Sequence, residues 1–263
     1  MTNKKSVSLY NGEVKLDFYP DSHRYKLEGE KTYLISATTC TGMIDKSRFL
    51  IPWALNCGER YLLKYIDSVS VLTKEELALK ITESKKASEL EKEEAADIGS
   101  LVHAFAQAFS ESKLNGTPTP EIPTDADPRI IAGINAFLDW YLQNDVKFIA
   151  CEQVVYSRDH GYCGIFDVLA EVNGQKLIID YKTSKAIYNE HRYQIAGYRE
   201  AYEEEYGKID GAMILHFDKE TGEFNTLELT DEDHALDLPV FLACYTIKKR
   251  DKELTKMNGY KPE

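Results

Sequence analysis

Two aspartates in neighbouring apolar segments are spaced so that they can face each other. Asp167 and Asp180 each follow a run of apolar residues, and Asn173-Gly174 lies between the two segments. This dipeptide is a strong signal for a two-residue hairpin loop. With that loop, or with one of four residues, Asp167 lies opposite Asp180, with Cβ atoms about 4.5 to 5.5 Å apart. A three-residue loop would place the two carboxylates on opposite faces.

This pair of carboxylates predicts a metal site. Like charges that face each other across strands are destabilising, and apolar neighbours make the repulsion worse. Either one carboxylate is protonated or a cation lies between them, and two oxygen ligands suit Mg²⁺ or Mn²⁺. Lys182, two residues after Asp180, points to the same face. The alternative is that the aspartates only keep the strand ends soluble.

Two further residues are candidate ligands. Glu152 interrupts the apolar pattern of residues 147–156, where it is either a ligand or water anchor or an ordinary surface residue. His103 lies roughly 140° from the apolar stripe of its predicted helix, on the side of Gly99 and Ala106. It is either an exposed helical histidine or a ligand, since neutral imidazole commonly binds metals.

The elements that position these residues follow from apolar periodicity and turn signals. Short antiparallel strands are expected within residues 14–35. Helices are predicted at about 47–69, 74–96, 98–110, 188–206 and 239–251, and from Pro128 to about Leu142 after the loop 115–128. Strands are predicted over 147–156, 164–172, 176–182, 211–217 and 223–229. The order helix, three antiparallel strands, helix, strand predicts a mixed α/β core with an N-terminal appendage.

Composition limits the class of protein. The 263 residues carry a net charge of −12, which argues against a protein that coats nucleic acid with a basic surface. A small local site for nucleic acid is still compatible with this charge. No apolar run is long enough for a membrane helix, and the N-terminus lacks the apolar part of a secretory signal. Five cysteines without a C-x-x-C pair indicate free thiols, so a cytoplasmic location is expected.

Four motifs resemble the PD-(D/E)XK nucleases and, more narrowly, their RecB-type branch. In chain order they are His103 in GSLVHAF, Asp167 in GIFD, Asp180-Tyr181-Lys182 in IIDYKTS, and Gln194 with Tyr198 in QIAGY. Phe166 stands where the family name has proline. The segment FYPDSHRYKLEGEKTYLISATT and the tryptophan-containing helix after it resemble phage-type and mitochondrial genome maintenance exonucleases.

The resemblance implies a role for each motif residue. Asp167 and Asp180 would bind Mg²⁺ or Mn²⁺, joined by His103 and the backbone carbonyl of Tyr181. Lys182 would position or help to deprotonate the attacking water and would offset charge in the transition state. Glu152 is a further candidate catalytic residue.

Substrate-binding roles are expected for four residues after the second aspartate. Gln194 and Tyr198 would orient the lysine and the nucleic-acid backbone, and Thr183 and Ser184 would contact substrate. Related nucleases hold an iron–sulfur cluster with four cysteines. This chain has Cys57 early but only Cys244 late, so no iron–sulfur cluster is predicted.

The implied activity is that of a divalent-metal-dependent DNA exonuclease in phage or bacterial recombination, repair or replication. The expected substrate is single-stranded DNA or DNA with a free end, and a single-strand-annealing or replication protein is a candidate partner. Residues 1–95 would form an appendage covering the active site, and residues 96–263 the nuclease core. The alternatives are a structure-selective endonuclease, an RNA-processing nuclease, or an inactive nuclease fold that serves binding or assembly.

Overall fold

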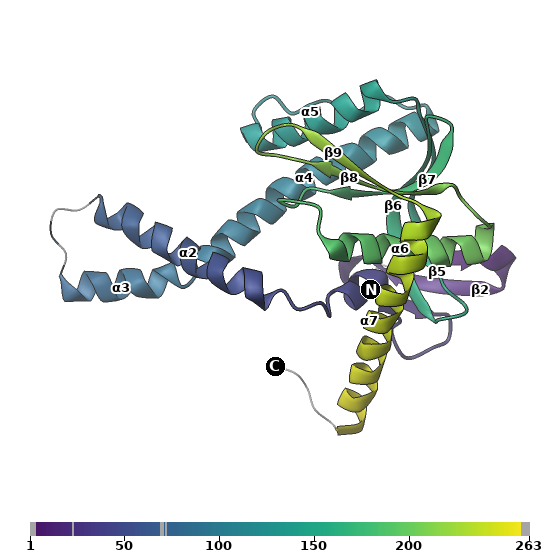
Figure 1. The fold of residues 1–263 in the computed structure, drawn as a ribbon, viewed down its shortest axis with the longest axis horizontal. Helices are drawn as coiled ribbons and strands as arrows, with labels where there is room; N and C mark the ends of the chain where they lie inside the picture. Colours follow the sequence, from purple (N-terminus) through teal and green to yellow (C-terminus); the bar gives the residue numbers. More distant parts are fainter. Residues whose placement is uncertain (1–3, 23, 69–70, 72, 259–263) are drawn as a thin grey trace. The chain divides into compact units, whose positions relative to one another are not determined.

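The computed structural model describes residues 4–22, 24–68, 71 and 73–258 (Figure 1). The chain divides into two compact units. The sheet unit consists of Met1–Ile44 and Val102–Glu263, and the helical unit is Asp45–Leu101. The predicted division between residues 95 and 96 falls inside one long helix, and it stays a prediction. Within the described part of the chain, every helix is too short or too polar to span a membrane.

The first strands of the sheet unit form a small antiparallel sheet. Its strands are β1 (Lys5–Leu9), β2 (Val14–Tyr19) and β3 (Arg24–Leu27), with the 3₁₀ turns η1 (Tyr10–Gly12) and η2 (Pro20–Ser22) between them. The predicted short antiparallel strands within residues 14–35 are confirmed, whereas β1 was not predicted. Leu16 and Tyr25 are buried and pack in one cluster with Val154, so this sheet shares a core with the larger one.

The larger sheet has six strands and carries the candidate site. They are β4 (Ile35–Ser36), β5 (Val146–Tyr156), β6 (Tyr162–Val172), β7 (Gln175–Lys182), β8 (Gly211–Phe217) and β9 (Phe224–Leu229). As predicted, β5, β6 and β7 pair antiparallel in succession. β8 then pairs parallel to β7, and β9 antiparallel to β8. The predicted mixed α/β class is confirmed.

The turn between β6 and β7 has the expected length. Val172 pairs with Gln175, so Asn173 and Gly174 are the two loop residues. Both have positive φ, 51° and 84°, as a two-residue turn of this kind requires. The predicted register is therefore confirmed.

Two helices cover the sheet where the chain crosses from β7 to β8 and after β9. These are α6 (Asn189–Tyr206) and α7 (Asp231–Asn258), which share a buried cluster containing Ile195, Tyr198 and Phe241 (Figure 1). The prediction that the last helix begins at residue 239 was wrong. Asp233 N–H donates to the Thr230 hydroxyl and Thr230 N–H donates back to the Asp233 carboxylate, so a capping box starts α7 eight residues earlier.

The helices before β5 also differ from prediction at one point. The helices expected at 74–96 and 98–110 are instead α3 (Lys74–Ser84) and α4 (Ala87–Asn115). Residues 87–97 are good helix formers, so nothing ends the helix near residue 97. The break lies after Ser84, whose carbonyl packs so close to Gly58 that a Cβ there would be 3.3 Å away.

Two of the remaining helices agree with prediction, and one was not predicted. α5 (Pro128–Gln143) begins with Asp127 as its N-cap, because that carboxylate accepts a hydrogen bond from Arg129 N–H. α2 (Ser47–Ile66) matches the helix expected from residue 47, and the predicted end at Val69 lies outside the described residues. The short helix α1 (Ala37–Thr41) follows β4 and was not predicted.

Candidate active site

β6 and β7 separate where the two aspartates lie. The last regular pair of the hairpin is Val168 with Ile179, one step before Asp167 and Asp180. Beyond it the Tyr181 N–H donates to Asp167 Oδ2 at 2.7 Å. The carboxylate thus serves as acceptor for a strand N–H, which holds it beside β7.

Asp180 is a buried carboxylate that is poorly compensated. It is 3% exposed, and burial, together with repulsion from Asp167, raises its pKa to about 6 despite the opposing charge of Lys182. Its Oδ2 forms an ion pair with Lys182 Nζ but accepts no hydrogen bond of regular geometry. Burying two carboxylates with one lysine is costly, and a bound divalent cation would offset the repulsion between Asp180 and Asp167.

His103 on α4 contacts the first aspartate. Its Nε2 lies 3.1 Å from Asp167 Oδ1, and the imidazole is partly buried rather than open to solvent. Burial lowers the pKa of His103, but the hydrogen bond and charge of Asp167 outweigh this and raise it. Burial raises the pKa of Asp167, and the His103 contact with the charge of Lys182 lowers it overall. The structure therefore brings all four residues into one electrostatic group.

Lys182 supplies the positive charge of this group. Its side chain is 18% exposed, and its Nζ also donates to Gln194 Oε1 at 3.4 Å. Burial lowers the pKa of Lys182, but the charges of Asp180 and Asp167 raise it overall. Lys182 is accordingly held as an ammonium.

Gln194 and Tyr198 on α6 lie behind the lysine. Gln194 Nε2 donates to Tyr198 Oη at 2.7 Å and to the hydroxyl of Thr38 at 3.0 Å. Both α6 residues are buried, so they support Lys182 from inside the protein. Thr38 was not among the predicted site residues. It lies 156 positions before Gln194, and no spacing rule connects them.

Three predicted residues remain apart from this group. Glu152 is exposed and has a φ of 45°, so its backbone is in the left-handed region. Thr183 and Ser184 lie in the loop after β7, where the Ser184 hydroxyl donates to Ala186 O at 2.8 Å. Among the described residues, none of the three forms a hydrogen bond or ion pair with either aspartate or with His103. Their roles stay predictions, as does that of the Tyr181 carbonyl.

A second histidine–carboxylate group lies elsewhere in the sheet unit. His160, Glu200 and Glu204 each offer one ligand atom, and these atoms lie within 4.8 Å of one another. Both oxygens of Glu204 already accept hydrogen bonds, from Ser157 Oγ at 2.6 Å and from Arg158 N–H at 2.7 Å. This group therefore has less need of a cation than the aspartate pair.

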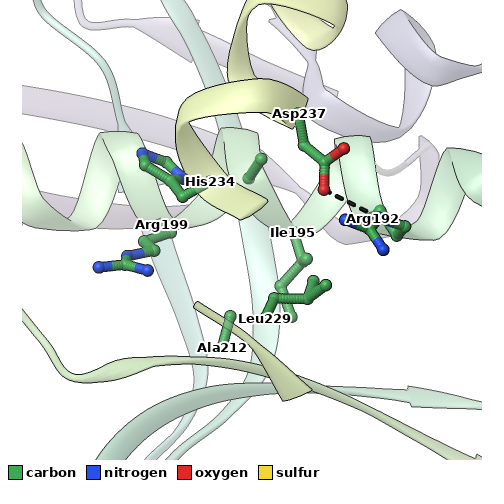
Figure 2. A pocket seen from close by; sticks show the side chains of 8 residues that line it. Arg192, Ile195, Arg199, Ala212, Leu229, His234 and Asp237 are labelled. Carbon is green, nitrogen blue, oxygen red and sulfur yellow. Dashed lines mark hydrogen bonds and ion pairs between the residues drawn. The ribbon is translucent and has the colours of Figure 1, made fainter. Parts of the chain in front are cut away.

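Beside this group, charged residues of α6 and α7 line a cavity of about 10 Å³, room for about one water molecule (Figure 2). Arg192 Nε donates to Asp237 Oδ2 at 2.9 Å, and the nearly fully buried Arg199 donates to Glu203 at 2.8 Å. His234, also at the cavity, lies 3.2 Å from Glu200 Oε2. The pair Arg192–Asp237 joins α6 to α7, as does the ion pair of Arg199 with Asp231.

Comparison with known proteins identifies a family. The family model described as the PD-(D/E)XK nuclease superfamily matches residues 54–251. Curated proteins provide no match. One solved structure, described as "Crystal structure of SSO0001", is 18% identical with a TM-score of 0.27. The similar region covers 45% of this chain and 57% of the other chain. This chain therefore spans little more than half the length of that protein. The family match spans most of the present chain, including both aspartates, and the chain belongs to the PD-(D/E)XK nuclease superfamily.

Proposed function

We propose that this protein is a divalent-metal-dependent DNA exonuclease of the RecB-type branch. The observation that carries the proposal is the buried Asp180 carboxylate, whose pKa is raised to about 6 and which lies in one electrostatic group with Asp167, His103 and Lys182. Apolar packing or a full set of donors would be expected if these residues served only stability.

The residues present fit a hard divalent cation such as Mg²⁺ or Mn²⁺. Asp167 and Asp180 would hold it through carboxylate oxygens, with His103 and the Tyr181 carbonyl as further ligands. When bound, such an ion polarises phosphoryl oxygens and makes hydroxide accessible near neutral pH. The net negative charge of the two aspartates and one lysine favours its binding.

Lys182 contributes positive charge next to the scissile phosphate. In the metal-free protein the charges of Asp180 and Asp167 raise its pKa, so that it is an ammonium. An ammonium here would position the attacking water and offset charge on the phosphoryl oxygens, and help with deprotonation of the water is the other proposed role. Gln194 Oε1 fixes the direction of the ammonium by accepting its hydrogen bond.

We assign the substrate as DNA with a free end, in recombination, repair or replication of a phage or bacterium. A chain with a net charge of −12 has little general affinity for polyphosphate, so binding should depend on a feature that enters a confined site. A strand end is such a feature. Thr183 and Ser184, next to Lys182, are candidates for contacts with the nucleic-acid backbone.

The test is incubation of end-labelled linear DNA and covalently closed single-stranded circles with Mg²⁺, with Mn²⁺ and with EDTA. We expect stepwise loss of the linear DNA with either metal, intact circles, and no cleavage in EDTA. Rapid cutting of circles would identify an endonuclease. Cleavage of an RNA strand in place of DNA would change the substrate class, and absence of cleavage of either would indicate an inactive module.

A further inference from the structure

The side-chain amide of Gln194 is held at both ends. Its oxygen accepts from Lys182 Nζ at 3.4 Å. Its nitrogen donates to Tyr198 Oη at 2.7 Å and to Thr38 Oγ1 at 3.0 Å. An amide nitrogen has two hydrogens, so Tyr198 and Thr38 together account for both.

The orientation of this amide decides whether Lys182 has a second acceptor besides Asp180. The two ends of a glutamine amide are nearly equal in size, and its neighbours determine which end points where. If the amide rotated, an N–H group would face the ammonium of Lys182, where only repulsion is available. The ammonium, which is only a donor, therefore selects the amide oxygen, and the hydroxyls of Tyr198 and Thr38 hold the amide in this orientation by accepting from its nitrogen.

Thr38 reaches this place because the backbone before it is fixed. Ile35 and Ser36 of β4 pair in parallel with the start of β6, and Ser36 Oγ caps α1 by accepting from Thr39 N–H. Ala37 is fully buried, which fixes the first turn of α1 against the core. Thr38 itself is exposed, so its hydroxyl approaches Gln194 from the solvent side.

Tyr198, the third residue of the arrangement, can take its position because residue 164 is a glycine. A Cβ on Gly164 of β6 would lie 2.5 Å from Cε1 of the Tyr198 ring, so only glycine lets the ring lie there. The ring position brings Tyr198 Oη to 3.5 Å from Thr38 Oγ1. Residues from α1, β6 and α6 thus converge on one amide.

We propose that Thr38 is a positioning residue, whose hydroxyl holds the Gln194 amide with its oxygen toward Lys182. The expected effect on kcat rests on the proposed nuclease function, in which Lys182 acts on the phosphoryl group. The hydrogen bonds of the Gln194 amide do not depend on catalysis, because they can be measured in the metal-free protein.

The kinetic experiment compares Thr38→Val, which removes the hydroxyl at equal size, with Thr38→Ser, which keeps it. Loss of one hydrogen bond should lower kcat about fivefold with KM unchanged, because water can partly replace an exposed hydroxyl. Thr38→Ser should restore the wild-type rate. Thr39→Val is the matched control, since the Thr39 hydroxyl bonds to Ser36 and not to Gln194.

The second measurement uses the side-chain N–H₂ signals of Gln194 in ¹H–¹⁵N spectra without metal. Both hydrogens should exchange slowly with water in the wild type and in Thr38→Ser, and one should exchange faster in Thr38→Val. Unchanged exchange in Thr38→Val overturns the proposal, as does an unchanged kcat. A wild-type protein that cleaves no nucleic acid would refute the proposed function, while the exchange measurement would still decide the role of Thr38.

Discussion

Two groups in the sheet unit each combine a histidine with two carboxylates. In the first, His103 lies with Asp167 and Asp180, and in the second His160 lies with Glu200 and Glu204. The ligand atoms of the second group are within 4.8 Å of one another, so proximity alone would favour it as a metal site.

The difference lies in how the carboxylates are already used. Glu204 accepts hydrogen bonds with both oxygens, and Glu200 lies in contact with His234. Asp180 instead is buried beside a second carboxylate, with Lys182 as its ion-pair partner, and burial raises its pKa to about 6. A carboxylate with a full set of donors stabilises the fold, whereas a buried carboxylate whose charged form is disfavoured would gain from a bound cation. The first group is therefore the better candidate metal site, although the ligand atoms of the second are close together.

The largest expected effect is on the rate of cleavage, and it should be seen for the first group and not for the second. Asp180→Asn keeps the shape of the side chain but removes the charge that would hold the ion, so cleavage should fall at least about a hundredfold. Glu200→Gln should cleave DNA at the wild-type rate. Rates are measured with end-labelled linear DNA and Mg²⁺. A fully active Asp180→Asn would remove the metal assignment.

Metal binding should show the same contrast. Paramagnetic Mn²⁺ should broaden the imidazole signals of His103 at concentrations that leave those of His160 sharp. Asp180→Asn should weaken Mn²⁺ binding at least about tenfold, since even residues that only support ligands contribute about that much. NMR titration of the wild type and this variant checks the prediction. Broadening of His160 first would move the metal site to the second group.

For folding stability, in contrast to activity, the second group should matter more than the first. Glu204→Gln keeps one oxygen but replaces the other with a donor, so either the Ser157 hydroxyl or the Arg158 N–H loses its acceptor, which should lower the free energy of unfolding by about 1 to 3 kcal/mol. Urea denaturation measures this loss, and cleavage per folded molecule should be unchanged. A Glu204→Gln protein that is as stable as wild type would contradict the structural role of the second group.

The smallest effect concerns pH and the histidine next to the second group. Burial lowers the pKa of His234, and the hydrogen bond to Glu200 opposes this only in part. The folded protein therefore binds this proton more weakly than the unfolded chain, so stability should fall as the pH falls through the range below about 6.5.

His234→Asn should remove part of that pH dependence. Urea midpoints at pH 7.5 and pH 5.5 should differ less in the variant than in the wild type. An equal difference in both proteins would show that protonation of His234 does not affect folding.

The hairpin was predictable because its signals are local. Asn173-Gly174 fixes the loop length, and the alternation along both strands then places Asp167 and Asp180 together with Lys182. Most helices and strands followed from periodicity in the same way. The start of α7 was missed although its signal, Thr230 with Asp233, is also local and readable as a capping box.

Other features had no local signal. The break between α3 and α4 lies after Ser84, where packing against Gly58 decides the turn and no glycine or proline marks it. Glu152 was a reasonable candidate from its place in an apolar strand, yet its positive φ and exposure depend on how β5 continues along β6. Burial and pairing across strands are not encoded in a few neighbouring residues.

The grouping of the two aspartates with the lysine was therefore readable from residue types and spacing, because a two-residue turn and strand alternation act over short distances. The tertiary structure decided which carboxylate has its pKa raised by burial and which residue supports the lysine. Asp180 is buried by elements far apart in the chain, and Thr38 meets Gln194 only after α1 and α6 pack together. Desolvation and contacts over long sequence separation arise from packing, and they determine the pKa and the orientation of the groups that the motif supplies.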